Sequence, residues 1–232
     1  MWNGKMKALT FSYDDGVAQD KRLIEIFDKY GLKATFNINS ALLGTDGYLI
    51  RDGVRVDHIK VPKNEVKSIY RNYEVSAHTL HHPFLPDIKD DDEIIGEIEN
   101  DRAELSRLVG YDVVGLAYPC GGPNTNERVE DIVKKHTGVK YARTIIDSDS
   151  FDLQSDLIHF NPTVYHREFE KMERFADEFI NLQPETPKLY YIWGHSYEFD
   201  INDSWDKFEK FCEKISGRDD IYYCTNKEAF CL

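Results

Sequence analysis

Segments with the pattern of a strand alternate along this chain with segments that have the pattern of a helix. Seven segments have the composition of strands, and they span residues 7–13, 33–39, 74–79, 113–119, 139–145, 188–193 and 220–225. Amphipathic segments with helical spacing lie at 20–31, 63–73, 91–110, 126–138, 168–183 and 204–217, and we expect a short helix after the last strand. Repeated strand–helix units favour a parallel sheet. About seven of them predict an α/β fold whose sheet curls into a barrel.

Length and composition place the chain among globular proteins. It has 232 residues and contains no linker or low-complexity segment, so we interpret residues 1–232 as a single domain. The formal net charge of −13 disfavours nucleic acid as a partner, because a phosphate backbone would be repelled. No apolar run approaches the roughly 20 residues needed to span a bilayer, so we expect no membrane partner.

The N-terminal segment and the cysteines bear on location. The segment MWNGKMKALTF lacks the basic region and long apolar stretch of a signal peptide. This favours a cytoplasmic location, with a secreted protein that has lost its leader as the alternative. None of the cysteines has CxxC spacing, and we interpret them as free thiols in a reducing compartment; they are Cys120, Cys212, Cys224 and Cys231.

Chemically active residue types follow several of the predicted strands. In parallel α/β folds the carboxyl ends of the strands meet at one rim, and sites form there. The segments at these ends are Asp14-Asp15, HTLHHP at 78–83, AYPCGGPN at 117–124 and WGHSYEFD at 193–200, and the fifth strand carries Arg143. Two acids and several histidines on a shared rim indicate metal binding combined with acid–base chemistry.

The histidine cluster is the stronger half of this pattern. A short turn after the strand can direct His78 and His82 toward one point while His81 faces elsewhere. Two imidazoles and one carboxylate form a common site for a divalent metal with open positions for water and substrate. A lone histidine after a strand is more often a surface or hydrogen-bonded core residue, so the prediction depends on the cluster.

The adjacent acids fit the same interpretation. One aspartate can bind the metal while its neighbour, pointing in another direction, takes a proton from metal-bound water. The alternative is that Asp14 and Asp15 are the cap and first-turn acid of the following helix. That alternative leaves unexplained why the histidine pair and His195 also fall at strand ends of the same hand.

Three short motifs in this chain resemble a known family. SYDDG, HTLHH and AYPCG, in this order and spacing, resemble the first three motifs of polysaccharide deacetylases, the NodB-homology group of carbohydrate esterase family four. The resemblance extends from about residue 8 to residue 200. It implies a distorted (β/α) barrel with about seven parallel strands, and a metal-dependent removal of N- or O-acetyl groups from a sugar.

The resemblance also implies a role for each matching residue. It assigns the general base to Asp14 and the general acid to His195. One divalent ion, expected to be zinc with cobalt, nickel or manganese as alternatives, is assigned to Asp15, His78 and His82. The implied partner is an acetylated saccharide.

Other positions match the family less well. The resemblance implies that the backbone N–H of Tyr118 donates to the oxyanion and that Thr79 lies near the site. The family's third motif opens with an arginine that orients the base, and this chain has Ala117 there. We predict that Arg143 on the neighbouring strand replaces it, holding the carboxylate with two hydrogen bonds. The equally weighted alternative is a surface arginine paired with an acid such as Asp147.

These departures leave the substrate open. The Asp-Trp of the family's fourth motif is not evident, so the chain resembles a divergent branch, similar to the NodB domain of gellan-lyase-like proteins. We predict a hydrolase that removes acetyl groups from a carbohydrate by attack of metal-bound water. The alternatives are an amide hydrolase for a small non-sugar substrate and a non-catalytic carbohydrate-binding module. The loops at 40–60 and 145–165 determine whether the site is a pocket or a groove.

Overall fold

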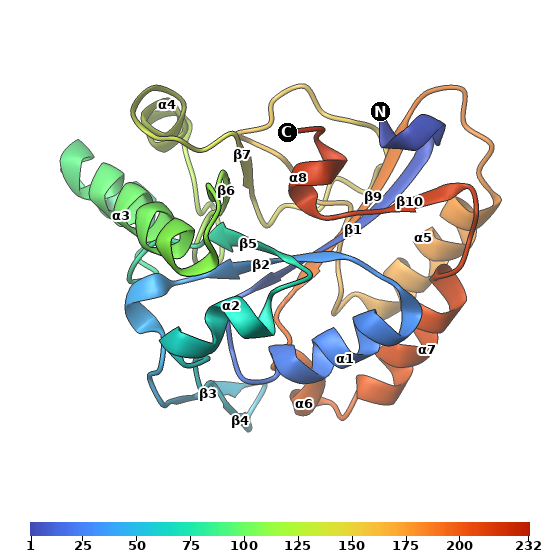
Figure 1. The fold of residues 1–232 in the computed structure, drawn as a ribbon, viewed down its shortest axis with the longest axis horizontal. Helices are drawn as coiled ribbons and strands as arrows, with labels where there is room; N and C mark the ends of the chain where they lie inside the picture. Colours follow the sequence, from blue (N-terminus) through green and yellow to red (C-terminus); the bar gives the residue numbers. More distant parts are fainter.

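A curled sheet of parallel strands forms the centre of the fold in the computed structural model, which describes residues 1–232 (Figure 1). Seven strands follow one another in the order β7-β6-β5-β2-β1-β9-β8 and curl through 236° into a half-barrel. They are β1 (Lys7–Asp14), β2 (Ala34–Ile38), β5 (Glu74–Ala77), β6 (Gly115–Ala117), β7 (Tyr141–Arg143), β8 (Val164–Tyr165) and β9 (Lys188–Gly194). The predicted distorted (β/α) barrel is therefore confirmed.

The central strand β1 determines how the strand ends align. All eight of its residues are buried, as expected for a parallel strand covered on both faces. The strand β10 (Ile221–Tyr223) pairs with the first part of β1, and β2 pairs with the last part. In this register Asp14 lies opposite Asn37 of β2, and Tyr13 lies opposite Gly194 of β9. The residues that follow these strands consequently emerge side by side.

Helices surround the sheet. They are α1 (Asp20–Tyr30), α2 (Val66–Ile69), α3 (Asp91–Val109), α4 (Glu127–His136), α5 (Phe169–Asn181), α6 (Glu198–Ile201), α7 (Trp205–Ile215) and α8 (Asn226–Ala229), with 3-10 turns at Trp2–Gly4, Ser40–Leu42, Lys63–Glu65 and Leu85–Asp87. Gly31 and Gly110 end α1 and α3 with φ of 66° and 87°. Glycine adopts this left-handed conformation without a Cβ penalty, so these two ends were readable in the sequence.

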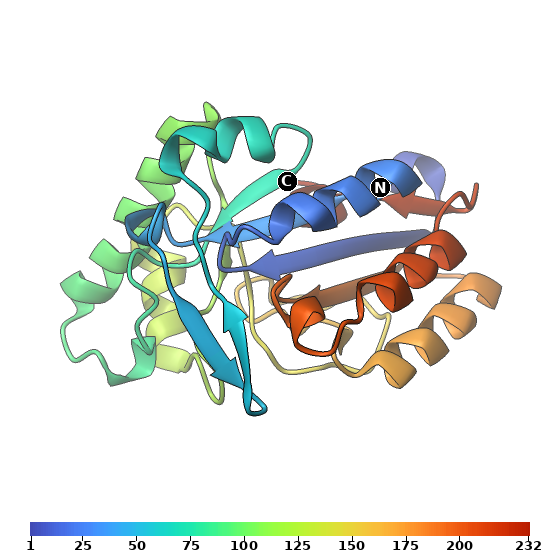
Figure 2. The same cartoon turned by 90° about the horizontal axis from the view of Figure 1, so that it is seen from below.

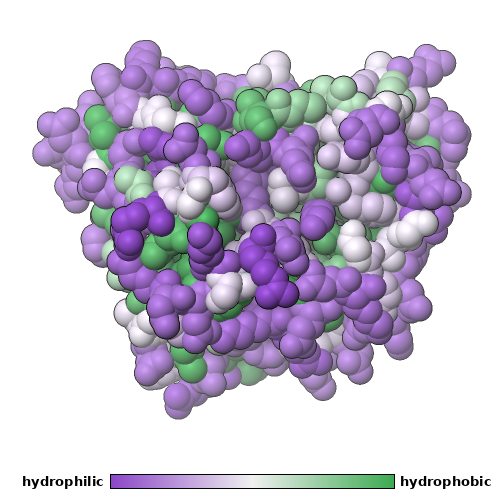
Figure 3. Space-filling view, viewed as in Figure 1, coloured by the Kyte–Doolittle hydropathy of each residue, from purple (hydrophilic) through white to green (hydrophobic).

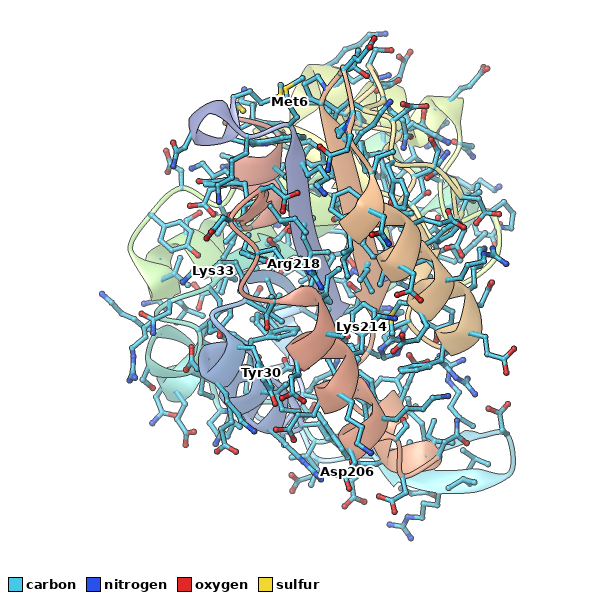
Figure 4. The ribbon with its side chains drawn as sticks, turned by 90° about the vertical axis from the view of Figure 1, so that its right-hand side faces the viewer. Met6, Tyr30, Lys33, Asp206, Lys214 and Arg218 are labelled. Atoms are coloured by element: carbon cyan, nitrogen blue, oxygen red, sulfur yellow. The ribbon has the colours of Figure 1, made fainter.

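The outer helices pack on the sheet through apolar faces and meet each other through charged ones. Figure 4 shows α7, with Lys214 labelled, beside α5 and in front of the central strands. The Lys214 ammonium lies 2.6 Å from Glu173 and 2.8 Å from Asp177, both on α5. The face shown in Figure 3 is mainly hydrophilic with scattered apolar residues. No helix is both long and apolar enough to cross a membrane, and all four cysteines are free.

An antiparallel hairpin stands apart from the sheet, in a segment that the sequence predicted as a loop. It consists of β3 (Tyr48–Arg51) and β4 (Val54–Asp57) and projects beside α6 (Figure 2). The hairpin is mostly exposed, so it lacks the continuous apolar pattern of the sheet strands. Val56 anchors it by packing with Val17, Tyr197 and Ile201. The two-residue strand β8 and the short helix α6 were also not predicted.

Candidate active site

The strand ends surround a cavity of about 610 Å³. Its walls come from β1, β5, β6 and β9 and from the hairpin segment. Among the residues predicted from the sequence, those that line it are Asp14, Asp15, His78, His82, Tyr118 and His195. Arg143 lies behind Asp14 and is itself buried. The structure therefore brings together residues that are up to 181 positions apart in the chain.

Asp14 is buried and held by charge-assisted hydrogen bonds. A single nitrogen of Arg143, Nη2, lies 2.5 Å and 2.6 Å from its two carboxylate oxygens, and Asn37 donates to Oδ1 at 2.7 Å. Burial by itself raises the pKa of this carboxyl, but the Arg143 guanidinium and the nearby histidines hold it below the usual value. The alternative partner for the arginine is wrong, since Asp147 pairs with Lys171 at 3.0 Å.

Arg143 is fixed on every side, which suits it to aim Asp14. Its Nε donates to the Ser12 hydroxyl at 3.2 Å, and Nη1 donates to the Thr144 carbonyl at 2.9 Å. The guanidinium stacks over the Trp193 ring, 4.7 Å from its centroid. The arginine thus occupies the geometry expected of a replacement for the side chain missing at Ala117.

Asp15 faces a different set of partners, which the sequence reasoning missed. Lys60 Nζ lies 3.2 Å from Oδ1 and 2.7 Å from the backbone carbonyl of Asp15. His58 Nε2 lies 3.1 Å from Oδ2. Burial raises the pKa of Asp15, but the Lys60 ammonium and the His58 hydrogen bond hold it well below the usual value. Each oxygen keeps a further lone pair, so these contacts leave room for a cation.

His78 presents a free nitrogen lone pair to the cavity. Its Nδ1 donates to the Ala117 carbonyl at 2.8 Å, so its Nε2 must be the unprotonated nitrogen of the neutral ring. This Nε2 is buried and has no hydrogen-bond partner. Burial lowers the pKa of His78 to about 4, which keeps the ring neutral at physiological pH.

The three predicted ligands converge. One ligand atom from each of Asp15, His78 and His82 lies within 4.8 Å of the others. His82 Nε2 is 3.9 Å from Asp15 Oδ1, while His81 turns outward to Glu97 at 2.7 Å. An orphaned buried imidazole nitrogen beside a carboxylate and a second imidazole fits a divalent metal ion, so the donor set passes this chemical test.

Unusual backbone conformations cluster at this site. Four non-glycine residues around the cavity have positive φ, namely Asp15 (83°), Thr79 (65°), His82 (62°) and Cys120 (71°). The Asn39 amide holds the turn by donating to the carbonyls of His78 and Thr79 at 2.6 Å and 3.0 Å. Strained residues of this kind persist where the surroundings constrain them, and they concentrate at functional sites.

The expectation for Tyr118 needs correction. Its backbone N–H donates to the Arg143 carbonyl at 3.0 Å as part of the sheet, so it is not free for an oxyanion. Its hydroxyl is also engaged, with the Ile158 carbonyl at 2.9 Å. Two residues later, the Cys120 N–H lies 3.4 Å from His82 Nε2, at the wall of the cavity. The Cys120 N–H is therefore engaged as well, with a nitrogen of a predicted metal ligand.

His195 lies between the base and a third carboxylate. Its Nε2 is 4.0 Å from Asp14 Oδ2, and its Nδ1 is 3.2 Å from Glu198 Oε2. The same oxygen accepts from the His195 N–H at 3.2 Å and pairs with His166 Nε2 at 2.8 Å. Burial lowers the pKa of His195, but the negative charge of Glu198 together with the two aspartates raises it to about 9.

Of the site residues that the sequence did not predict, Glu198 could have been found from a local pattern, whereas His58 and Lys60 could not. Glu198 stands three residues after His195, and one helical turn there brings its carboxylate back to the ring. His58 and Lys60 follow a hairpin strand with no distinctive pattern. The Val61 N–H donates to the Gly16 carbonyl at 2.9 Å and so attaches this segment to the end of β1. This long-range contact places His58 and Lys60 at the site.

The strand ends of the parallel half-barrel thus carry an Asp-His-His set that could hold a metal ion, with a second carboxylate beside it. Comparison with known families agrees, because the model described as polysaccharide deacetylase matches residues 3–142, more than half of the chain. The chain therefore belongs to the polysaccharide deacetylase family. A search of the curated proteins found no match.

Solved structures share the fold at low sequence identity. The Xyl-CE4 domain of a xylanase from the hindgut metagenome of Trinervitermes trinervoides has a TM-score of 0.60 at 15% identity, covering 97% of this chain and 90% of that chain. The peptidoglycan deacetylase PdaC from Bacillus subtilis has a TM-score of 0.55 at 16% identity, covering 96% and 89%. The Streptococcus pyogenes deacetylase PplD has a TM-score of 0.50 at 19% identity. That match covers 65% of this chain and 61% of PplD.

Proposed function

We propose that this protein is a metal-dependent hydrolase that removes acetyl groups from an N- or O-acetylated carbohydrate. The observation that carries this proposal is that a carboxylate and an imidazole face each other in one cavity, each beside a group of opposite charge. Arg143 contacts Asp14 and favours its ionised form, whereas Glu198 lies 3.2 Å from His195 and favours its protonated form. His195 Nε2 is 4.0 Å from Asp14 Oδ2. A base and an acid held at this spacing suit a reaction that takes a proton from water and gives one to a leaving group.

The ligand set for the metal is Asp15, His78 and His82. When bound, a divalent ion supplies Lewis-acid polarisation of the acyl carbonyl and of water. Two imidazoles and one carboxylate suit zinc, with cobalt, nickel and manganese as the alternatives. A structure with the same fold, the family 4 acetyl xylan esterase from Clostridium thermocellum at 17% identity and a TM-score of 0.52, is described as a complex with cobalt.

The residues of the chain account for both proton transfers. Asp14 accepts a proton as the water oxygen bonds to the acyl carbon. His195 then donates a proton to the sugar nitrogen or oxygen as its bond to the acyl carbon breaks. The products are acetic acid, which ionises to acetate by losing a proton to solvent, and the free amine or alcohol. The proton held by Asp14 returns to His195 through solvent, which restores both residues.

The substrate class rests on the family and on the cavity. Neighbouring structures are described as a peptidoglycan deacetylase and a family 4 acetyl xylan esterase, which supports an acetylated sugar and leaves both amide and ester linkages open. The cavity of about 610 Å³ falls within the range of small-ligand sites, and this supports amide hydrolysis of a small substrate as the second candidate. The opposed acid and base favour either enzyme over a non-catalytic binding module.

The test is acetate release by the metal-stripped protein after each candidate metal is added back. N-acetylated and O-acetylated oligosaccharides are assayed in parallel with a small acetamide. Asp14→Asn should keep the metal and lose about 100- to 10,000-fold in kcat, the range expected for a general base. Asp206→Asn is the matched control, since Asp206 is exposed on α7 and labelled in Figure 4. Cleavage by Asp14→Asn at the wild-type rate would contradict the proposal.

A further inference from the structure

The hairpin β3–β4 brings basic side chains to a cavity whose other walls are made by strand ends. Leu49 and Arg51 face the cavity from β3, and His58 and Lys60 reach it from the segment after β4. The segment is attached to the end of β1, because Ala18 N–H donates to the Ile59 carbonyl at 2.8 Å. These side chains are therefore held by backbone pairing and by the packing of Val56, which fixes where they can meet a ligand.

Of these basic groups, Arg51 differs from the two others. Lys60 and His58 are both bound to Asp15, as described above. Arg51 forms no ion pair, and its only hydrogen bond runs from Nη2 to the neutral Tyr197 hydroxyl at 3.2 Å. The adjacent Asp52 pairs instead with Arg167. A guanidinium at the cavity wall thus keeps its charge and most of its donors free.

The acids of the cavity offer Arg51 no compensation. Asp14 is paired with Arg143, and Asp15 is paired with Lys60 and His58. Both carboxylates that line the cavity are consequently neutralised from within, and a bound divalent ion would add positive charge. This happens in a chain whose formal net charge is −13, so the surroundings do not make the cavity attractive to anions in general. The free positive charge is local to the site.

We propose that the substrate carries a carboxylate, as in an acetylated uronic acid, and that Arg51 binds this group. The inference rests on the proposed deacetylase function and adds the substrate class to it. Guanidinium binds carboxylate with two parallel hydrogen bonds, and Arg51 is exposed at the cavity wall, so a substrate carboxylate can reach it. Tyr197 connects this anion site to the reacting groups, since its hydroxyl accepts from Arg51 Nη2 at 3.2 Å and its ring lies 5.1 Å from the His195 ring, centroid to centroid.

The experiment compares two sugars that differ only in the charged group. One is 2-acetamido-2-deoxyglucose, and the other is the uronic acid in which its C6 hydroxymethyl is a carboxylate. Wild-type protein loaded with zinc should favour the acid by about 2- to 5-fold in kcat/KM, the range of an ion pair at an exposed side chain. Arg51→Gln should reduce this ratio to about 1, and Arg51→Lys should keep part of it.

Arg55→Gln is the matched control. Arg55 lies on the same hairpin but on its opposite face, stacked over Tyr48 at 4.2 Å and away from the cavity. It removes the same charge and should leave the ratio at its wild-type value. A ratio that changes equally in both variants would mean a general electrostatic effect and would overturn the assignment to Arg51.

Calorimetric binding of both sugars separates this inference from the proposed function. If neither sugar is cleaved, the deacetylase proposal loses support for these substrates, and the ratio of dissociation constants then measures the preference. A tighter complex with the acid that is lost in Arg51→Gln supports the anion site. Equal binding of the two sugars, binding of neither, or a preference that survives in Arg51→Gln overturns it.

Discussion

His78 and His195 line the same cavity on either side of β1, yet their pKa values move in opposite directions. His78 is buried and the His195 side chain is 14% exposed, and burial by itself disfavours the protonated form of each. Behind His78 is the neutral carbonyl of Ala117, and the pKa of the ring is lowered to about 4. Behind His195 is the carboxylate of Glu198, and the pKa of that ring is raised to about 9.

The difference shows how one fold can favour opposite protonation states for two histidines in the same cavity. A neutral ring with a free Nε2 suits the proposed metal ligand, whereas a protonated ring suits the proposed proton donor. The two pKa values differ in direction because a neutral carbonyl contacts His78, whereas a carboxylate lies beside His195. Variants that remove one ring or one backing group therefore test the comparison directly.

The largest expected effect separates the two rings by metal binding. His78→Ala removes the orphaned Nε2 and should abolish stoichiometric zinc binding, whereas His195→Ala should bind one equivalent like the wild type. Metal analysis after dialysis, together with calorimetric titration of the stripped proteins, measures both. If His78→Ala kept one equivalent at wild-type affinity, the ligand assignment would be wrong.

The second effect concerns Asp14, the proposed base, which lies beside His195 in the cavity. Arg143→Lys should lower kcat by about 10- to 100-fold while metal and fold are retained, because an ammonium cannot hold Asp14, the Ser12 hydroxyl and the Thr144 carbonyl together. Circular dichroism and metal content check that fold and metal are retained. Arg128→Lys, at an arginine paired with Asp91 away from the cavity, is the control. Unchanged kcat in Arg143→Lys would remove the positioning role.

The smallest effect is a shift in pH dependence. His195 must be protonated to act, so kcat/KM should decline as the pH rises through about 9. Glu198→Gln removes the charge that favours the imidazolium, the pKa of His195 falls, and the decline should begin at lower pH. Glu130→Gln alters another carboxylate–histidine pair, with His159 at 2.6 Å and outside the cavity, and should leave the profile alone. An identical alkaline limb in Glu198→Gln would show that Glu198 does not set it.

The sequence by itself predicted the half-barrel and the proposed metal ligands, because both depend on short-range patterns. Alternating strand and helix segments specify a parallel sheet, whose strand ends share a rim wherever the connections lie. His78 and His82 stand in one turn, and Asp14 and Asp15 are neighbours, so local geometry already constrained the set. The motif resemblance pointed to the same residues.

Only the tertiary structure decided which partner each of these residues has. The sequence left Arg143 with two alternatives, and the register of β7 placed it on Asp14, 129 positions away. The same strand pairing uses the Tyr118 N–H, which no motif could reveal. Lys60 meets Asp15 through a hairpin that has no apolar pattern of its own. Pairings of this kind depend on register and on long-range packing, and a local pattern contains neither.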